Sequence, residues 1–369
     1  MAIVLNRCSG ITGRRMLHIK GLDGFRGVAV LIVMCAHFNG LFGITSGTLG
    51  VDLFFVLSGF LITSLLLTEI EQTGTVALGA FYLRRLLRLL PALFITVIVF
   101  GLIDLAFGIW PREIVLKSMA ATVLQYPSNW IRALDLWNMF EFGHTWSLAI
   151  EEQFYLFWPV ALLGLCPVRS RPTIIGALAV PIVGMQINRY VAAAGGAPTA
   201  WLSAATHMRI DAIFIGCLAA FVSPYVKTDR LRQFLFPAAV AGALLIVSVI
   251  IWRRGYYEWQ QPLVVWSSAA IILHLAHGHE TTLHRALSVS WLTYTGRISY
   301  GLYLYHYPIW YLTVQTFGGA LATDTKQLIG FFLLAPLSFA MAAASYRYVE
   351  APALRLKSRF RADPTPAPA

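Results

Sequence analysis

Residues 22–43, LDGFRGVAVLIVMCAHFNGLFG, form an almost wholly apolar stretch that nevertheless contains Arg26 and His37. In an α-helix the eleven-residue spacing amounts to about 1100°, close to three whole turns, so both side chains project from one face roughly 16 Å apart. Asp23 projects to nearly the same side. An imidazole this deep in an apolar helix is costly, which favours a functional histidine over one satisfied by packing alone. Arg26 is explained equally well by anchoring at a membrane interface.

The composition is unusually apolar for a chain of 369 residues. Hydrophobic residues make up 58% of it, charged residues 12%, and the mean hydropathy is +0.68, whereas a soluble domain has about 25% charged residues. A run of about 20 apolar residues can cross a bilayer as a helix. The sequence therefore predicts an all-α, polytopic membrane helix bundle of about ten transmembrane helices, at 22–43, 49–69, 88–110, 145–165, 172–194, 209–225, 233–252, 262–277, 298–317 and 328–348, with 114–126 as a further partial or interfacial piece.

The net charge of +11 does not indicate a nucleic-acid partner, because Lys and Arg gather in alternate loops. Cytoplasmic loops carry an excess of these residues. With the N-terminus inside, 18 cations fall inside and 6 outside, which predicts an N-in/C-in, multi-pass protein of the cell inner (plasma) membrane. The inside set is Arg7, Arg14, Arg15, Lys20, Arg84, Arg85, Arg88, Arg169, Arg171, Lys227, Arg230, Arg232, Arg285, Arg297, Arg355, Lys357, Arg359 and Arg361, and the outside set is Arg112, Lys117, Arg132, Arg253, Arg254 and Lys326.

One membrane domain is expected to occupy residues 18–355, between a basic extension at 1–17 and a basic, Pro/Ala-rich tail at 356–369. The extension is basic without an apolar core, so it is not a signal peptide. No metal is predicted, because the four cysteines form no CxxC pair and the spacing of His274, His277 and His279 fits no standard site. No tightly bound cofactor is expected either.

The second and third spans carry further polar residues. Asp52 is expected near the outer surface, where a helix N-terminal charge and a functional role are equally favoured. Ser58 and Gly59 are small and favour close helix packing. Arg85 and Arg88 are three residues apart and so are neighbours on one helix face. Taken alone, they favour contact with anionic lipid over a phosphate clamp.

Later spans add carboxylates and a second histidine. Glu151 and Glu152 are adjacent inside a span and point about 100° apart, so one of them is expected to face a cavity or a cation. Arg209 and Asp211 are most simply explained by pairing with each other. His306 lies two residues before Pro308, which kinks a helix and frees a carbonyl.

Together, seven of these segments resemble the acyltransferase-3 family of integral membrane acyltransferases. The likeness runs from about residue 22 to 352, nearly the whole chain, and each segment is weak alone but the ordered set is specific. The segments are LDGFRG with His37, GVDLFFVLSGF at 50–60, Arg85-Leu-Leu-Arg88, TWSLAIEEQFY at 145–155, Arg209-Ile-Asp211, SYGLYLYH at 299–306 and YVEAP at 348–352.

The resemblance implies an enzyme that moves an acyl group, usually acetyl, from cytoplasmic acyl-CoA to a hydroxyl of a carbohydrate, polysaccharide, lipid-linked glycan or small molecule. Acyl-CoA is then a co-substrate, and some members carry a fused extracytoplasmic esterase-like domain. This chain is expected to be the membrane module alone, so a separate extracytoplasmic partner stays open.

The resemblance and the chemistry of acyl transfer suggest roles for the candidate residues. His37 is the expected base, or it takes the acyl group covalently, since imidazole titrates near neutral pH. Arg26, Arg85 and Arg88 are expected at the donor, and Glu151 is expected to orient a catalytic group or pair with a buried arginine. Four further residues are expected either on the acceptor side or in a structural role, namely Asp52, Arg209, Asp211 and His306.

A secondary transporter that exports a glycan or small molecule is the competing class, because buried charges and broken helices also mark transport paths. A sensor or scaffold without activity is a third class, which the intact set of charged positions disfavours. The ordered motifs and the lack of a visible inverted repeat favour the acyltransferase.

Overall fold

The computed structural model describes residues 19–166, 170–226, 229–252, 259–277, 280–317 and 321–356, and these ranges contain helices and connecting turns but no strand. The predicted all-α class is therefore confirmed. The extension at 1–17, the tail beyond Leu356 and His279 lie outside the described residues. So do several of the cations counted above, namely Arg7, Arg14, Arg15, Arg169, Lys227, Arg253, Arg254, Lys357, Arg359 and Arg361.

Helices coincide with all ten predicted stretches. The long ones are α2 (Lys20–His37), α3 (Gly47–Thr73), α4 (Leu78–Phe107), α7 (Trp146–Leu165), α8 (Arg171–Ala194), α10 (Thr206–Val222), α11 (Asp229–Ile251), α12 (Gln260–His277) and α15 (Ser299–Phe317). The tenth stretch is a broken rod of α16 (Thr323–Ile329), η4 (Gly330–Leu334), α17 (Ala335–Ser345), η5 (Tyr346–Glu350) and α18 (Ala351–Leu356). The shorter connecting pieces are η1 (Leu41–Gly43), α5 (Arg112–Leu124), α6 (Ser128–Ala133), η2 (Phe140–Thr145), α9 (Thr199–Ala204), η3 (Ser223–Tyr225), α13 (Thr282–Leu287) and α14 (Ser290–Arg297).

Seven helical stretches within the described residues are long and apolar enough to cross a membrane, which makes this a multi-pass membrane protein. They are Gly47–Thr73, Leu78–Phe107, Phe140–Leu165, Arg171–Ala194, Thr199–Tyr225, Gln233–Ile251 and Thr323–Leu356. Three predicted spans, carried by α2, α12 and α15, are helices of 18 or 19 residues that are long enough but fall outside this set by composition. Each carries internal polar groups that lower its apolar character, among them Arg26 and His37 on α2 and His306 on α15.

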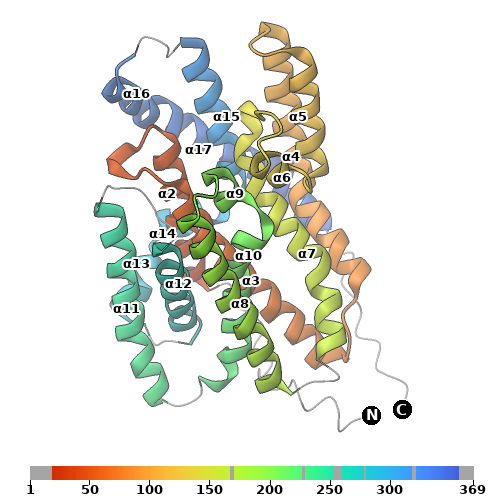
Figure 1. The fold of residues 1–369 in the computed structure, drawn as a ribbon, viewed down its shortest axis with the longest axis vertical. Coiled ribbons are helices and arrows are strands. Elements are labelled where there is room, and N and C mark those ends of the chain that lie inside the picture. The colour runs from red at the N-terminus through yellow and green to blue at the C-terminus, as the bar shows by residue number, and fades with distance from the viewer. Residues whose placement is uncertain are drawn as a thin grey trace.

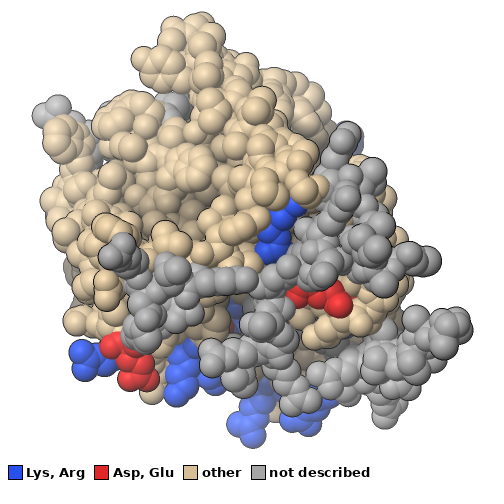
Figure 2. Space-filling view, turned by 90° about the horizontal axis from the view of Figure 1, so that it is seen from below, with Lys and Arg blue, Asp and Glu red and all other residues tan. Residues whose placement is uncertain are grey.

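The bundle is elongated, with most of the long helices running between its two ends (Figure 1). At the lower end in that view α3 and α7 terminate and α8 begins, whereas α5 and α16 lie at the upper end. The predicted partial piece at 114–126 is α5, a helix of 13 residues that packs along α4. Viewed from the lower end, Lys and Arg side chains gather along one edge of the molecule (Figure 2).

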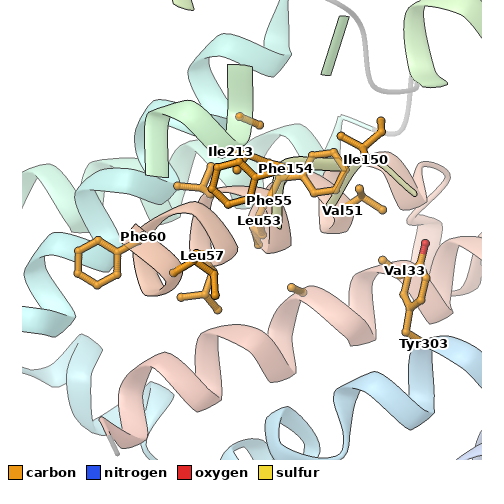
Figure 3. Close-up of a cluster of buried hydrophobic side chains, with 14 of the residues drawn as sticks. Val33, Val51, Leu53, Phe55, Leu57, Phe60, Ile150, Phe154, Ile213 and Tyr303 are labelled. Atoms are coloured by element: carbon orange, nitrogen blue, oxygen red, sulfur yellow. The ribbon is translucent and has the colours of Figure 1, made fainter. Parts of the chain in front are cut away.

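Helix α3 is the centre of the packing. It contacts α2, α7, α10 and α12, and 78% of its most apolar window is buried inside the protein. A helix that is apolar on all sides is expected to be buried in this way. Figure 3 shows its side chains meeting those of α7 and α10; the residues labelled there include Leu53, Phe55, Phe60, Phe154 and Ile213. Among the seven candidate spans, α3 has the largest buried share, and the other helices pack around it.

Two glycines let α3 and α10 approach backbone to backbone. A Cβ atom on Gly59 would lie 2.0 Å from the carbonyl oxygen of Ile213, and one on Gly216 would lie 2.0 Å from that of Val56. No side chain fits at such distances, so the predicted packing role of Gly59 is confirmed. Small residues allow this close approach in membrane bundles, where helix packing cannot rely on the hydrophobic effect.

We expect Gly216→Ala to destabilise the protein by about 1–3 kcal/mol, because the added methyl group forces the two helices apart. Thermal unfolding of purified protein in detergent measures the change. The matched control is Gly176→Ala on α8, where nothing lies within 4 Å of the added Cβ atom. Equal midpoints for the two variants would contradict the close contact.

Candidate active site

A cavity that encloses about 780 Å³, including its open side, lies between α2, α3, α4, α7 and α15. Its lining joins residues that are far apart in sequence. Arg26, Arg85, Arg88 and Glu151 all border it, and the remainder of the wall is apolar and aromatic, with Phe54, Phe55, Leu61, Tyr155, Tyr300 and Tyr303 among its members. The residues predicted to meet the donor are therefore brought together in one place.

Helix geometry explains why three guanidinium groups share this cavity. Arg85 and Arg88 are one turn apart on α4, so they line the same wall. Arg26 enters from α2, and among the described residues it forms one ion pair, a long one of 3.7 Å to Asp23. Arg85 lies over the ring of Tyr155 at 4.4 Å from its centre, which is a cation–π contact. Among the described residues, no carboxylate lies within ion-pair distance of Arg85 or Arg88.

Glu151 is the carboxylate of the cavity wall. It accepts a hydrogen bond of 2.7 Å from the hydroxyl of Ser58, and Tyr155 donates to that hydroxyl at 3.3 Å. The expectation that one of the two adjacent glutamates faces a cavity is confirmed, since Glu151 lines it and Glu152 does not. Ser58, which was expected only to allow close packing, instead holds Glu151. Three cations against one anion leave the cavity with an excess of positive charge.

Tyr303 forms the boundary between the cavity and a cluster of histidines. Its ring lines the cavity, while its hydroxyl donates to the carbonyl oxygen of His144 at 2.7 Å and lies 2.5 Å from the hydroxyl of Ser147. The same ring contacts His306, with ring centres 5.8 Å apart. A single side chain thus separates the arginine-lined space from the histidines.

The histidine cluster consists of His37, His144 and His306 with the ring of Tyr307. The Nδ1 atom of His37 lies 2.8 Å from the Nε2 atom of His306, and the two rings are stacked. Tyr307 contacts both His37 and His144 through ring centres 4.7 and 5.0 Å away. His306 was predicted as an acceptor-side or structural residue, and the fold makes it the direct partner of His37.

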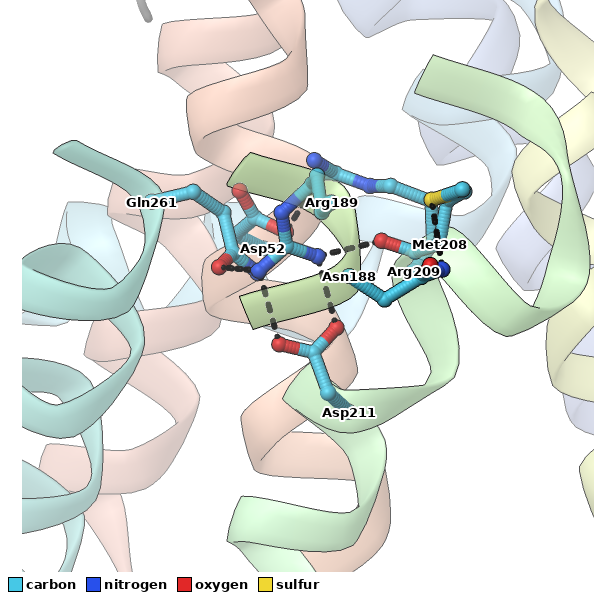
Figure 4. A network of polar contacts seen from close by, with 7 residues as sticks. All are labelled: Asp52, Asn188, Arg189, Met208, Arg209, Asp211 and Gln261. Atoms are coloured by element: carbon cyan, nitrogen blue, oxygen red, sulfur yellow. Dashed lines mark hydrogen bonds and ion pairs between the residues drawn. The ribbon is translucent and has the colours of Figure 1, made fainter. Parts of the chain in front are cut away.

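Asp52, Arg209 and Asp211 lie elsewhere, in a buried network of ion pairs between α3, α8, α10 and α12 (Figure 4). The predicted pairing of Arg209 with Asp211 is wrong. Arg209 pairs with Asp52 at 2.5 Å, and Asp211 pairs with Arg189. Because residues two apart on a helix point in different directions, Arg209 and Asp211 each pair with a residue on another helix.

Arg189 joins three helices in this network. It forms two parallel bonds of 2.9 and 3.0 Å to the carboxylate of Asp211 and also donates to Gln261 and to the carbonyl oxygen of Met208. Asp52 and Asp211 are both fully buried, and none of the network lines the cavity. A structural role is the one that this position favours for Asp52, Arg209 and Asp211, rather than the acceptor entrance.

Asp52→Asn is expected to destabilise the fold by about 3–5 kcal/mol, because it leaves the buried charge of Arg209 without this carboxylate. Thermal unfolding in detergent again measures the loss. As a control, Glu113→Gln removes an exposed carboxylate that pairs with Lys117 on α5 and should leave the midpoint unchanged. A stable Asp52→Asn protein with impaired turnover alone would favour the acceptor role instead.

Sequence reasoning missed several residues of the site. Ser147, Tyr155, Tyr303 and His144 were not singled out, although each lies in or beside a motif that had been noticed. Tyr303 stands three residues before His306, one helical turn away, and that spacing was the available signal. Arg189 lies within the predicted span at 172–194 and was assigned no role.

The fold and the cavity define a polytopic membrane protein with an internal polar site. A family model described as "Acyltransferase domain" matches residues 19–347. The chain belongs to the acyltransferase-3 family.

The relatives that match this chain are named as O-acetyltransferases. "Putative O-acetyltransferase SACOL0978" of Staphylococcus aureus is 32% identical over 372 residues, covering 94% of this chain and 59% of that protein. The peptidoglycan O-acetyltransferase OatA of Listeria monocytogenes is 30% identical over 91% of this chain and 56% of its own length. The O-acetyltransferase OatA of Staphylococcus aureus is 31% identical over 91% of this chain and 57% of its own length. The chain thus spans less than two thirds of these relatives, and no solved structure matches it.

Proposed function

We propose that this protein is a membrane O-acyltransferase that moves an acyl group, most simply acetyl, from acyl-CoA to a hydroxyl of a cell-envelope glycan. The observation that carries the proposal is the cavity in which three arginines face one glutamate, one side chain away from the His37–His306 pair. Family membership and the names of the relatives support the acyl-transfer chemistry. The same cavity gives the export of a glycan no specific support.

The donor occupies the arginine-lined cavity in this proposal. Coenzyme A carries phosphate groups, and guanidinium groups bind phosphate through paired hydrogen bonds. Arg85 and Arg88, which have no carboxylate partner among the described residues, are the natural clamp. Arg26 adds a third positive charge to the cavity from α2.

The transfer itself requires a base for the acceptor hydroxyl. We place His37 in this role: it removes the hydroxyl proton while the acceptor oxygen forms a bond to the acyl carbon. The carbon–sulfur bond of the thioester then breaks, and the proton returns from His37 to the coenzyme A thiolate. Glu151, held by Ser58, balances part of the positive charge of the cavity without forming an ion pair with any of the three arginines. In the covalent alternative, the acyl group rests on the histidine before it reaches the acceptor.

The acceptor is proposed by analogy with the relatives. One relative is named as a peptidoglycan O-acetyltransferase, so a hydroxyl of a cell-wall or other envelope glycan is the acceptor to test first. In this proposal the protein lies in the inner membrane and crosses it ten times, with both termini in the cytoplasm. The donor then binds from the cytoplasmic side and the acceptor from the outer side. The Lys and Arg side chains seen at the lower end support that orientation (Figure 2).

His37→Ala should reduce acyl transfer by at least about 10²-fold, because the proposed base is gone. The measurement is transfer of labelled acetyl from acetyl-CoA to envelope glycan by purified protein in proteoliposomes, read by mass spectrometry of the glycan. The variant should still accumulate as a monodisperse protein. His284→Ala on α13, away from the cavity lining, is the control and should retain activity. Glycan flux without acylation in these vesicles would favour the transporter.

Replacing both Arg85 and Arg88 with Gln should weaken donor binding by about 10–100-fold, since a hydrogen bond to a charged group contributes about 1.5–3 kcal/mol. The KM for the acceptor should stay unchanged. Binding of acetyl-CoA in detergent and the two KM values measure the separation. Arg84→Gln is the matched control, because Arg84 pairs with Glu69 at 3.6 Å and does not line the cavity. Unchanged donor affinity in the double variant would return Arg85 and Arg88 to a lipid-anchoring role.

A further inference from the structure

We infer that His306 is a positioning residue that fixes the tautomer of His37, so that the Nε2 atom of His37 is the one that meets the substrate. The inference rests on the proposed function for its chemical meaning, but its structural content can be tested separately. It follows from a chain of three hydrogen-bonding groups, namely the carbonyl of Leu302, the ring of His306 and the ring of His37.

The first bond assigns the proton of His306. Its Nδ1 atom lies 2.8 Å from the carbonyl oxygen of Leu302, one turn earlier on α15. A carbonyl oxygen can only accept, so Nδ1 of His306 must carry the hydrogen and donate it. In a neutral imidazole the other nitrogen then has no hydrogen and can only accept. The Nε2 atom of His306 is therefore an acceptor.

The second bond passes this assignment to His37. The Nδ1 atom of His37 lies 2.8 Å from that acceptor, so it must be the donor. The Nε2 atom of His37 is left with its lone pair and no hydrogen. This is the form that a general base needs, and it is also the form that attacks an acyl carbon. One backbone carbonyl thus determines which nitrogen of a residue on another helix is reactive.

A charged His306 would reverse the assignment, and its surroundings argue against it. The side chain is fully buried, and its ring neighbours are Phe38, His37, His144, Tyr303 and Tyr307. No carboxylate forms an ion pair with it in the part of the chain that the structure describes. A buried cation without a counter-ion is costly, so the neutral ring is favoured.

The free nitrogen of His37 lies beside Gly47 on α3. No described group hydrogen-bonds to Nε2 of His37, and a Cβ atom on Gly47 would lie 3.5 Å from it. His37 is also the last residue of α2, and Asn39 and Gly40 then turn the chain with φ values of 61° and 74°. A side chain at a helix end needs an outside partner to hold its orientation, and the rigid middle of α15 supplies one.

Nitrogen-15 NMR of histidine-labelled protein in detergent tests the assignment directly. The His37 signals are identified by their absence from the spectrum of His37→Ala. We expect a protonated Nδ1 and an unprotonated Nε2 in wild-type protein. The finding of a protonated Nε2 on neutral His37 would overturn the inference. This readout does not depend on whether the protein transfers an acyl group.

Two conservative replacements of His306 separate positioning from packing. Gln places its terminal amide near the position of Nε2 and can still accept from His37, whereas the shorter Asn ends near Nδ1 and cannot. His306→Asn should lower kcat by about 10–100-fold, the usual effect of losing an orienting partner, with both KM values unchanged. His306→Gln should restore most of that loss. Thermal midpoints that match between the two variants exclude a difference in folding.

The outcomes distinguish this inference from the proposed function. Wild-type transfer activity that survives His306→Asn unchanged would overturn the positioning role and leave the acyltransferase in place. The expected tautomer in a protein without transfer activity would overturn the proposed function and keep the assignment. Loss of activity in both variants, with the His37 tautomer unaltered in both spectra, would also contradict positioning through the hydrogen bond.

Discussion

The rest of the structure depends on the cost of a charge inside an apolar bundle. A buried cation is stable only beside an anion, a ring face or a ligand, because the bundle offers it no water. Arg189 and Arg209 meet this demand with Asp211 and Asp52 and so tie helices together. Arg85 lies over the ring of Tyr155, but neither Arg85 nor Arg88 has a carboxylate partner within the described residues, and both border a cavity. The same constraint thus separates the charges that form ion pairs within the bundle from those that face the cavity, where a ligand can bind.

The polar side chains within a helix also determine whether it is apolar enough to count as a membrane span. Helix α3 is mostly apolar and forms the centre of the packing, with glycine contacts to α10 that bring the backbones together. Helices α2 and α15, which carry His37 and His306, are shorter and less apolar, and they lie beside other helices rather than alone in lipid. Polar side chains that would be unstable in hydrocarbon are instead surrounded by neighbouring helices. The central helix α3 and the polar helices around it therefore depend on each other.

Much of the fold could be predicted, because apolar length is a local property of the chain. Every predicted stretch coincides with a helix, although only seven meet the length and composition of a span. The site was predicted in part. Arg26, Arg85, Arg88 and Glu151 were identified as costly charges, and they do meet in one cavity. The pairing of Arg209 with Asp211 was not correct, since nearness in sequence says nothing about which way two side chains point across a bundle.

By itself, the sequence determined that the chain is a helical membrane protein of the acyltransferase-3 type, and it marked the polar residues that an apolar environment makes expensive. Only the tertiary structure decided which of them share a cavity and which hold the bundle together. It brought Ser58 into hydrogen-bonding contact with Glu151 and His306 into hydrogen-bonding contact with His37. It also placed Tyr303 between the cavity and the histidines. Hydropathy and motif order can be read directly along the sequence. The hydrogen bond between His37 and His306 depends instead on how α2 and α15 pack, because the two residues are 269 positions apart in the chain.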